Sequence, residues 1–326
     1  MERLQGYSVK KALICGISGQ DGAYLSKLLL DKGYQVIGTS RDTKVSNFNH
    51  LDKLGIREDI EFVAMAINDF RSVLNVFDKI KPDEVYNLAG QSSVGLSFEQ
   101  PVETLESINI GTLNLLEAIR FLRLDSKLYN AGSSECFGES TPENPAHEGS
   151  CFIPRSPYAV AKASAHWLIS NYREAYNIYA CTGHLFNHES PFRGERFVTK
   201  KVISSIIKIY RKEQEKLHLG NLDIIRDWGW APEYVDAMWR MLQQEKADDF
   251  VIATGRSVSL KHFVKTAFDY FDLDMEQYLV LNEVFLRPTE LRCSYADPDK
   301  AYHQLGWKAQ YDIDDVVKMM IEEELR

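Results

Sequence analysis

Short apolar segments alternate with amphipathic segments through the first half of the chain. Between the apolar segments, hydrophobic residues recur three and four positions apart, which predicts helices at 21–32, 70–77, 102–122 and 158–176. The apolar segments have the length and composition of buried strands and lie at 12–17, 35–40, 60–65, 84–89, 127–131 and 179–186. This alternation predicts an α/β fold with a doubly wound parallel sheet.

The rhythm changes after residue 187. Loops become longer, a helix is predicted at 198–211, and an apolar segment at 250–254 looks like a late strand of the main sheet. We therefore expect two interleaved domains. Residues 9–187 with about 231–257 would form the sheet domain, and about 188–230 with 258–326 a smaller α/β domain.

Composition and charge narrow the function. The 326 residues include 38 basic and 47 acidic side chains, a net charge of −9 that argues against a nucleic-acid partner. No segment is apolar enough to suggest a membrane span, and the amino terminus lacks the apolar core of a secretory signal. The five cysteines are widely spaced, without a CxxC pair, so neither disulfides nor a metal site are expected. We expect a cytoplasmic protein.

A glycine-rich turn follows the first predicted strand and opens the first predicted helix. Glycines at this place let the backbone approach a dinucleotide pyrophosphate, and free amides at the helix start supply donors. The turn therefore predicts a Rossmann-type nicotinamide site. Its predicted cofactor-binding residues are Gly16, Ser18, Gly19, Gln20, Asp21 and Gly22.

The end of the second predicted strand bears on the choice of cofactor. Arg41 would accept the 2′-phosphate of NADP, whereas the neighbouring Asp42 would repel it. We expect NADP, with NAD as the less favoured alternative.

Four residues after the fifth predicted strand carry candidate chemistry. Tyr158 and Lys162 are four positions apart at the start of a predicted helix and so share a face, where the cation would favour a phenolate base. Ser133 lies at the carboxyl end of the preceding strand, and its hydroxyl can hold a reacting sugar oxygen. Glu135, two residues later, supplies a second base, which proton removal from carbon next to a ketone requires.

Longer motifs make the chain resemble the nucleotide-sugar 4,6-dehydratases of the extended short-chain dehydrogenase/reductase family, with GDP-mannose 4,6-dehydratases the nearest branch. They read GISGQDG from residue 16, YNLAGQSSV from 86, PRSPYAVAK from 154, LFNHESP from 185, RDWG from 226 and RPTE from 287. The resemblance implies that Tyr158, with Lys162 and Ser133, assists oxidation at C4 of the sugar. Glu135 then takes the C5 proton, water leaves from C6, and the hydride held by NADP returns there.

The resemblance also implies a set of binding residues and an assembly. The sheet domain would bind NADP and the smaller domain a GDP-sugar, and the chain would form a homodimer or homotetramer through the helices at 102–122 and 158–176. His188 is expected as a packed loop histidine beside the cofactor. The further implied cofactor residues are Leu88, Ala89 and Gln91, and the implied substrate residues are Ser92, Ser93, Asn187, Arg193, Val198, Lys201, Arg226, Arg287 and Glu290.

Three departures from the family pattern keep alternatives open. The family has Arg-Arg where this chain has Arg41-Asp42, an aspartate where it has Ala66, and Val-Asp where it has Leu291-Arg292. The substrate could therefore be another GDP-sugar, such as a GDP-manno-heptose. Sugar 4-epimerisation, 4-keto reduction and a non-catalytic NADP-binding homologue are the remaining alternatives, against which the presence of Glu135 beside the other three residues argues.

Overall fold

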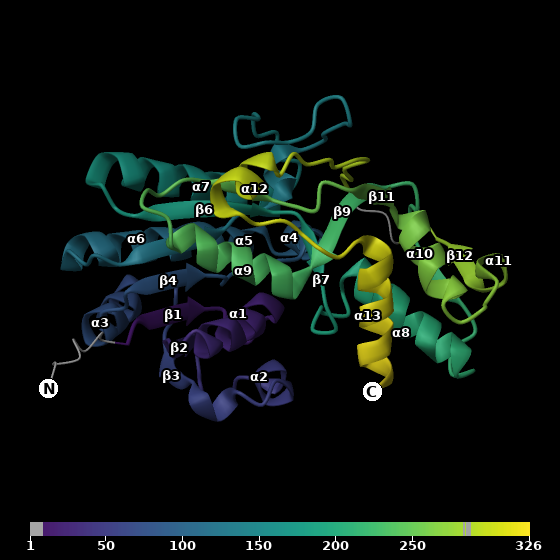
Figure 1. The fold of residues 1–326 in the computed structure, drawn as a ribbon, viewed down its shortest axis with the longest axis horizontal. Coiled ribbons are helices and arrows are strands. Elements are labelled where there is room, and N and C mark those ends of the chain that lie inside the picture. Colours follow the sequence, from purple (N-terminus) through teal and green to yellow (C-terminus); the bar gives the residue numbers. More distant parts are fainter. Residues whose placement is uncertain (1–8, 283, 285–287) are drawn as a thin grey trace, which may run out of the picture.

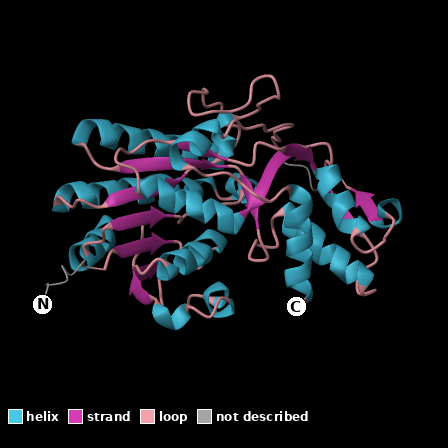
Figure 2. Cartoon of the chain, viewed as in Figure 1, coloured by secondary structure: helices cyan, strands magenta, loops and turns pink. Residues whose placement is uncertain are grey.

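Seven parallel strands form the main sheet of the chain. The computed structural model describes residues 9–282, 284 and 288–326. The strands run in the order β3-β2-β1-β4-β5-β6-β10, which confirms the predicted doubly wound sheet (Figures 1 and 2). Their bounds are β1 Lys11–Cys15, β2 Gln35–Ser40, β3 Glu61–Ala64, β4 Glu84–Asn87, β5 Lys127–Ala131, β6 Ala180–Leu185 and β10 Phe250–Ile252.

Helices cover both faces of this sheet. One face packs against α1 (Gln20–Asp31), α9 (Ala231–Leu242) and α12 (Asp299–Leu305), and the other against α3 (Phe70–Ile80), α6 (Gly111–Leu122) and α7 (Pro157–Tyr176). Central strands such as β1 are buried on both faces because helices lie on each, which explains their continuous apolar runs.

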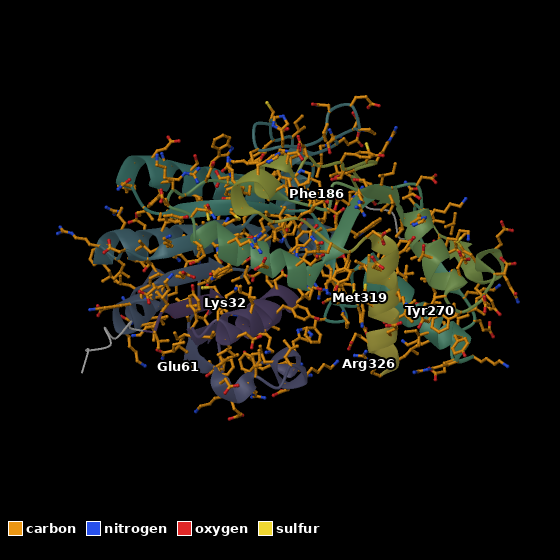
Figure 3. The ribbon with its side chains drawn as sticks, in the orientation of Figure 1. Lys32, Glu61, Phe186, Tyr270, Met319 and Arg326 are labelled. Atoms are coloured by element: carbon orange, nitrogen blue, oxygen red, sulfur yellow. The ribbon has the colours of Figure 1, made fainter. Side chains whose placement is uncertain are left out.

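A smaller part of the chain lies beside the carboxyl ends of the main strands (Figure 1). Its sheets are β11-β9-β7 and β12-β8, with bounds β7 Asn187–Glu189, β8 Leu217–Leu219, β9 Ile225–Trp230, β11 Ser257–Ser259 and β12 Leu279–Leu281. The helices α8 (Val198–Tyr210), α10 (Leu260–Asp269) and α13 (Ile313–Leu325) share a second apolar core with β8 and β9. Figure 3 labels Met319 on α13 and Tyr270 at the end of α10 in this part, and Phe186 in the link between β6 and β7.

The predicted helix 102–122 is interrupted. It comprises α5 (Pro101–Leu105), a π-helical turn η2 (Glu106–Ile110) and α6. A π turn inserts an extra residue that rotates one helical face relative to the next, which a regular apolar spacing does not reveal. Further short helices among the described residues are α2 (Asn49–Lys53), η1 (Arg57–Asp59), α4 (Val94–Glu99), η3 (Ser134–Phe137) and α11 (Met275–Tyr278).

Candidate active site

A cavity of about 600 Å³ opens at the carboxyl ends of the strands, where the strand order reverses between β1 and β4. It is lined by the turns after β1, β4 and β5, the start of α7, residues 185–198 and β9. Most of the residues predicted from the sequence meet there, although they come from distant segments. They are Gly16, Ser18, Gly19, Gln20, Asp21, Gly22, Leu88, Ala89, Ser92, Ser93, Ser133, Glu135, Tyr158, Lys162, Asn187, His188, Arg193, Val198 and Arg226.

The glycine turn forms a tight cradle on one wall of the cavity. Gly16 has φ +87°, and a Cβ atom there would lie 2.7 Å from the carbonyl oxygen of Leu88. A Cβ atom on Gly22 would lie 2.5 Å from the carbonyl oxygen of Gly16. The first amides of a helix have no intrahelical acceptor, and Gly19, the residue before α1, has no side chain to cap them. These features fit a dinucleotide pyrophosphate.

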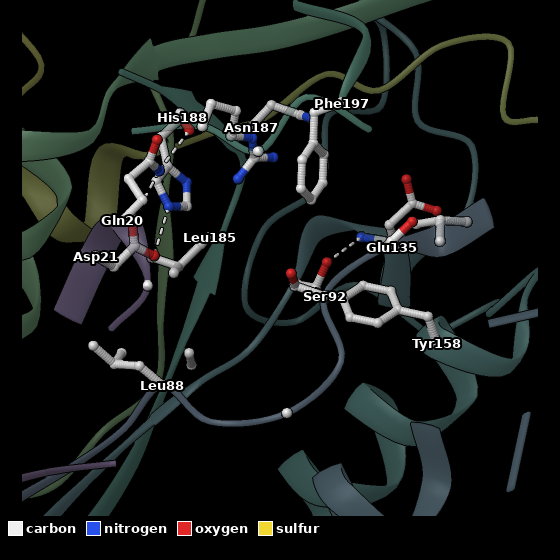
Figure 4. Close-up of a pocket in the computed structure, with 18 of the residues that line it drawn as sticks. Gln20, Asp21, Leu88, Ser92, Glu135, Tyr158, Leu185, Asn187, His188 and Phe197 are labelled. Carbon is white, nitrogen blue, oxygen red and sulfur yellow. Dashed lines mark hydrogen bonds and ion pairs between the residues drawn. The ribbon is translucent and has the colours of Figure 1, made fainter. Parts of the chain in front are cut away.

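A buried ion pair joins the start of α1 to the segment after β6. The imidazole of His188 lies 2.9 Å from Asp21 through Nε2, and its Nδ1 donates to the Phe186 carbonyl at 2.7 Å (Figure 4). Burial disfavours both charges, but their mutual attraction outweighs it, raising the pKa of His188 and lowering the pKa of Asp21. With Asp21 ionised, both ring nitrogens donate and His188 is an imidazolium. The pair fixes one edge of the cofactor cradle.

Tyr158, Ser133 and Lys162 meet at the opposite end of the cavity. Ser156 caps α7 and accepts the amide of Ala159 at 3.1 Å, which sets the start of the helix that carries Tyr158 and Lys162. The Lys162 ammonium donates to the carbonyl of Ala131 at 2.7 Å and lies 5.8 Å from the centre of the Tyr158 ring. The three side chains are thereby held by β5 and α7 together.

Burial dominates the electrostatics of these groups. It raises the pKa of Tyr158 well above its usual value, and the hydrogen bond with Ser133 offsets this only in part. Burial also lowers the pKa of Lys162 from 10.5 to about 8. Burial therefore opposes the phenolate that Lys162 is predicted to favour, and the Lys162 ammonium itself points to the Ala131 carbonyl.

Glu135 lies beside this group, in η3 directly after β5. Its amide donates to the Ser133 hydroxyl at 3.3 Å, so the same hydroxyl caps η3. Figure 4 shows Glu135 and Tyr158 on one side of the cavity, across from Gln20, Asp21 and His188. A carboxylate, a phenol and a hydroxyl thus face the same space, which suits two successive proton transfers on one substrate.

Arginines lie where the smaller part borders the cavity. Arg226 on β9 is buried, donates to the carbonyls of Ile225 and Leu291 at 2.9 and 2.8 Å, and pairs with Glu290 at 3.5 Å. Arg193 pairs with the buried Glu189 at 3.2 Å, so both cations are held in place. Such fixed guanidinium groups suit a diphosphate.

Several predicted residues do not line the cavity. Arg41 is exposed at the end of β2. Gln91 is used within its own loop, since its amide donates to the Ser93 carbonyl at 2.8 Å and to Thr104 at 3.2 Å. Lys201 donates to the His218 carbonyl at 2.7 Å, and Glu290 pairs with Arg226, which does line the cavity. Arg287 falls outside the described residues.

The cavity also contains residues that the sequence analysis did not identify. His50 comes from α2, Phe192 and Phe197 from the loop between β7 and α8, and Trp228 from β9. None stands in a glycine turn or at the end of a main-sheet strand. The RDWG and LFNHESP motifs contain or adjoin two of them, which was the available signal.

The described residues contain neither a cluster suited to a metal ion nor a membrane-spanning helix. Histidine, cysteine and carboxylate side chains form no cluster suited to a metal ion in 9–282, 284 and 288–326. Across these same residues no helix has the length and apolarity needed to span a membrane.

Comparisons with known proteins find similarity to one family along nearly the whole chain. The family model described as GDP-mannose 4,6 dehydratase matches residues 13–320. The chain is 47% identical to GDP-mannose 4,6 dehydratase 1 of Arabidopsis thaliana over 97% of its length and 90% of that protein. It is 39% identical to GDP-mannose 4,6-dehydratase of Vibrio cholerae over 97% of its length and 94% of that protein.

Solved structures share the fold at low sequence identity. The dTDP-glucose 4,6-dehydratase of Bacillus anthracis, in complex with NAD, superimposes with a TM-score of 0.84 at 17% identity, covering 97% of each chain. The protein RMD of Pseudomonas aeruginosa, complexed with NADPH, gives 0.80 at 21% identity, covering 98% of each chain. These neighbours carry either form of nicotinamide cofactor.

Proposed function

Because the chain belongs to the GDP-mannose 4,6-dehydratase family, we propose that it is a hydro-lyase that converts GDP-mannose to its 4-keto-6-deoxy derivative. The observation that carries the proposal is the meeting of Ser133, Glu135, Tyr158 and Lys162 around one cavity that also contains the glycine cradle. A simple alcohol oxidation would need only the hydroxyl, phenol and lysine. Glu135 supplies the additional base that elimination requires.

Each of these residues has a distinct task. Ser133 holds the 4-oxygen of the sugar and Tyr158 takes its proton, while Lys162 places positive charge near the oxygen that develops negative charge. Glu135 removes the C5 proton and returns a proton to the departing 6-hydroxyl, so that water leaves. The nicotinamide group, when bound, supplies reversible oxidation and reduction, with no net change over a cycle.

The arginines of the smaller part hold the nucleotide. Arg226 and Arg193 provide the positive charge for the diphosphate, with Asn187 and Val198 beside them on the cavity wall. The 4,6-dehydration of another GDP-sugar is the alternative, since the segment after Glu290 reads Leu291-Arg292 where the family has Val-Asp.

We assign NADP as the cofactor, on the evidence of Arg41 at the end of β2. This guanidinium is exposed and stands where the ribose of a Rossmann-bound dinucleotide is expected. Asp42 accepts the amide of Lys44 at 2.8 Å, which turns this carboxylate toward its own loop. NAD is the alternative.

A second copy of the chain is the proposed partner. Apolar side chains are exposed on α5, η2 and α7, and α7 packs against both of the other segments. Burying this surface between copies would remove it from water and support the helix that carries Tyr158. The side chains concerned are Val102, Leu105, Ile110, Val160 and Trp167.

Incubation with GDP-mannose and a sub-stoichiometric amount of NADP tests the proposal. Mass spectrometry should show a product lighter by one water, without accumulation of reduced cofactor. The same assay with a panel of other GDP-sugars distinguishes the alternative substrate. Absence of a dehydrated product from every nucleotide sugar would contradict the assignment.

A further inference from the structure

Three aromatic rings from separate segments are stacked at the edge of the cavity. The Phe192 ring lies between Tyr24 of α1 and His50 of α2. Its centre is 4.9 Å from that of Tyr24, with 16° between the ring planes, and 4.5 Å from that of His50, with 10° between the planes. We call Tyr24, Phe192 and His50 the ring stack. His50 and Phe192 both line the cavity.

Hydrogen bonds anchor the ring stack to the cofactor cradle. Nδ1 of His50 donates to the carbonyl of Ser18 at 3.1 Å, inside the glycine turn. At the other end, the hydroxyl of Ser190 donates to Gln20 at 2.7 Å and accepts the amide of Phe192 at 3.1 Å. Burial lowers the pKa of His50, and Nδ1 donates because it faces a carbonyl oxygen.

The stack joins the two sides of the cavity. Tyr24 and His50 belong to the cofactor side, because α1 begins at the glycine turn and α2 packs beside α1 (Figure 1). Phe192 begins the loop that leads to Arg193, Phe197 and α8 on the substrate side. In the chain, Phe192 lies far from both of its ring partners, so the contact forms only in the folded state.

We propose that the ring stack is a clasp that positions the phosphate-binding turn and keeps the cofactor bound between catalytic cycles. This inference rests on the proposed function, in which the cofactor ends each cycle in its starting state and need not exchange. His50 and Phe192 are both half-buried, and Phe192 and Tyr24 also pack against the edge of the main core. Release of the dinucleotide would require the rings to part.

Cofactor release measured without sugar tests the clasp. The protein is loaded with NADPH, mixed with excess NADP, and the loss of bound-state fluorescence is followed in a stopped-flow instrument. Losing one stacked pair should speed release about tenfold. We expect this for His50→Gln, which keeps a donor toward Ser18 but removes the ring. Phe192→Ala removes both stacked pairs and should speed release further. Phe192→Tyr should release at the wild-type rate.

A matched control separates the clasp from general loss of packing. Tyr210→Ala removes a ring that packs on Phe271, with the ring centres 4.6 Å apart and the planes tilted by 32°, away from the cavity; it should leave release unchanged. Wild-type release rates in both Phe192→Ala and His50→Gln would overturn the clasp, even if dehydration of GDP-mannose is observed. Failure to bind either NADPH or NADH would overturn the proposed cofactor together with the clasp.

Discussion

Replacing Lys162 by methionine should abolish turnover and yet stabilise the cofactor-free protein at neutral pH. The side chain is almost wholly buried and its ammonium donates to the Ala131 carbonyl at 2.7 Å. A buried charge without a carboxylate partner costs free energy that methionine, of similar length, does not. The residue is thus expected to be retained for chemistry at the expense of stability.

The magnitude follows from the pKa. Burial lowers the pKa of Lys162 from 10.5 to about 8, and each pKa unit corresponds to about 1.4 kcal/mol, so the charged form costs about 3 kcal/mol. The methionine variant also loses the hydrogen bond to Ala131, which destabilises it by about 1–2 kcal/mol and offsets part of this benefit. The net gain in the free energy of unfolding is therefore about 1–2 kcal/mol, or roughly 2–4 °C in Tm for a chain of this size.

The pH dependence has a definite sign. The folded pKa lies below the unfolded one, so the penalty is complete below about pH 8 and disappears as the pH rises toward 10.5. As the pH rises through this window, the free energy of unfolding of wild type should therefore increase relative to that of Lys162→Met. At the upper end of the window, wild type should be the more stable protein.

Thermal unfolding of both proteins at pH 6.5, 8 and 9.5, without cofactor, measures this difference. Lys127→Met is the matched control, because Lys127 also donates to backbone carbonyls, at 2.7 and 3.0 Å, but is only half-buried and lies outside the cavity. Lys127→Met should be less stable than wild type at every pH. A Lys162→Met protein that melts below wild type at pH 6.5, by an amount independent of pH, would refute the reasoning.

Four other substitutions test separate parts of the proposal. Glu135→Gln should bind substrate but neither release water nor exchange the C5 proton with deuterium oxide, as followed by mass spectrometry. Gly22→Ala places a Cβ atom 2.5 Å from the carbonyl of Gly16, so calorimetry should show a loss of about 1–3 kcal/mol in stability and titration a weaker cofactor. Arg41→Ala should weaken NADP far more than NAD in equilibrium titrations. Trp167→Glu places a charge on a side chain that is 62% exposed on α7, and should lower the assembly mass in light scattering.

Contrary outcomes are equally specific. Normal turnover of Glu135→Gln would remove it as the elimination base. Gly95→Ala, where the nearest atom lies 3.9 Å from the added Cβ, serves as the control for Gly22→Ala and should melt like wild type. Equal weakening of both cofactors by Arg41→Ala would show that Arg41 does not read the 2′-phosphate. An unchanged mass for Trp167→Glu would place any assembly on another surface.

Features set by neighbouring residues were predictable. The main strands, the glycine turn and the start of α7 depend on local apolar spacing, on turn residues and on a cap such as Ser156. In the second half, α8 agrees with the predicted helix 198–211, whereas α9, α10 and α13 were not predicted. The capping box at Asp312, which opens α13, is a local signal that was available.

The α/β class, the cofactor turn and the four residues proposed for catalysis follow from the sequence alone, because the pattern behind each involves residues close together in the chain. The packing of distant segments sets other features: Phe192 stacks on His50, Gln91 turns into its own loop, and burial raises the pKa of Tyr158. Those outcomes depend on which distant segments pack together and how much water they exclude, and neither quantity is encoded in the spacing of residues along one segment.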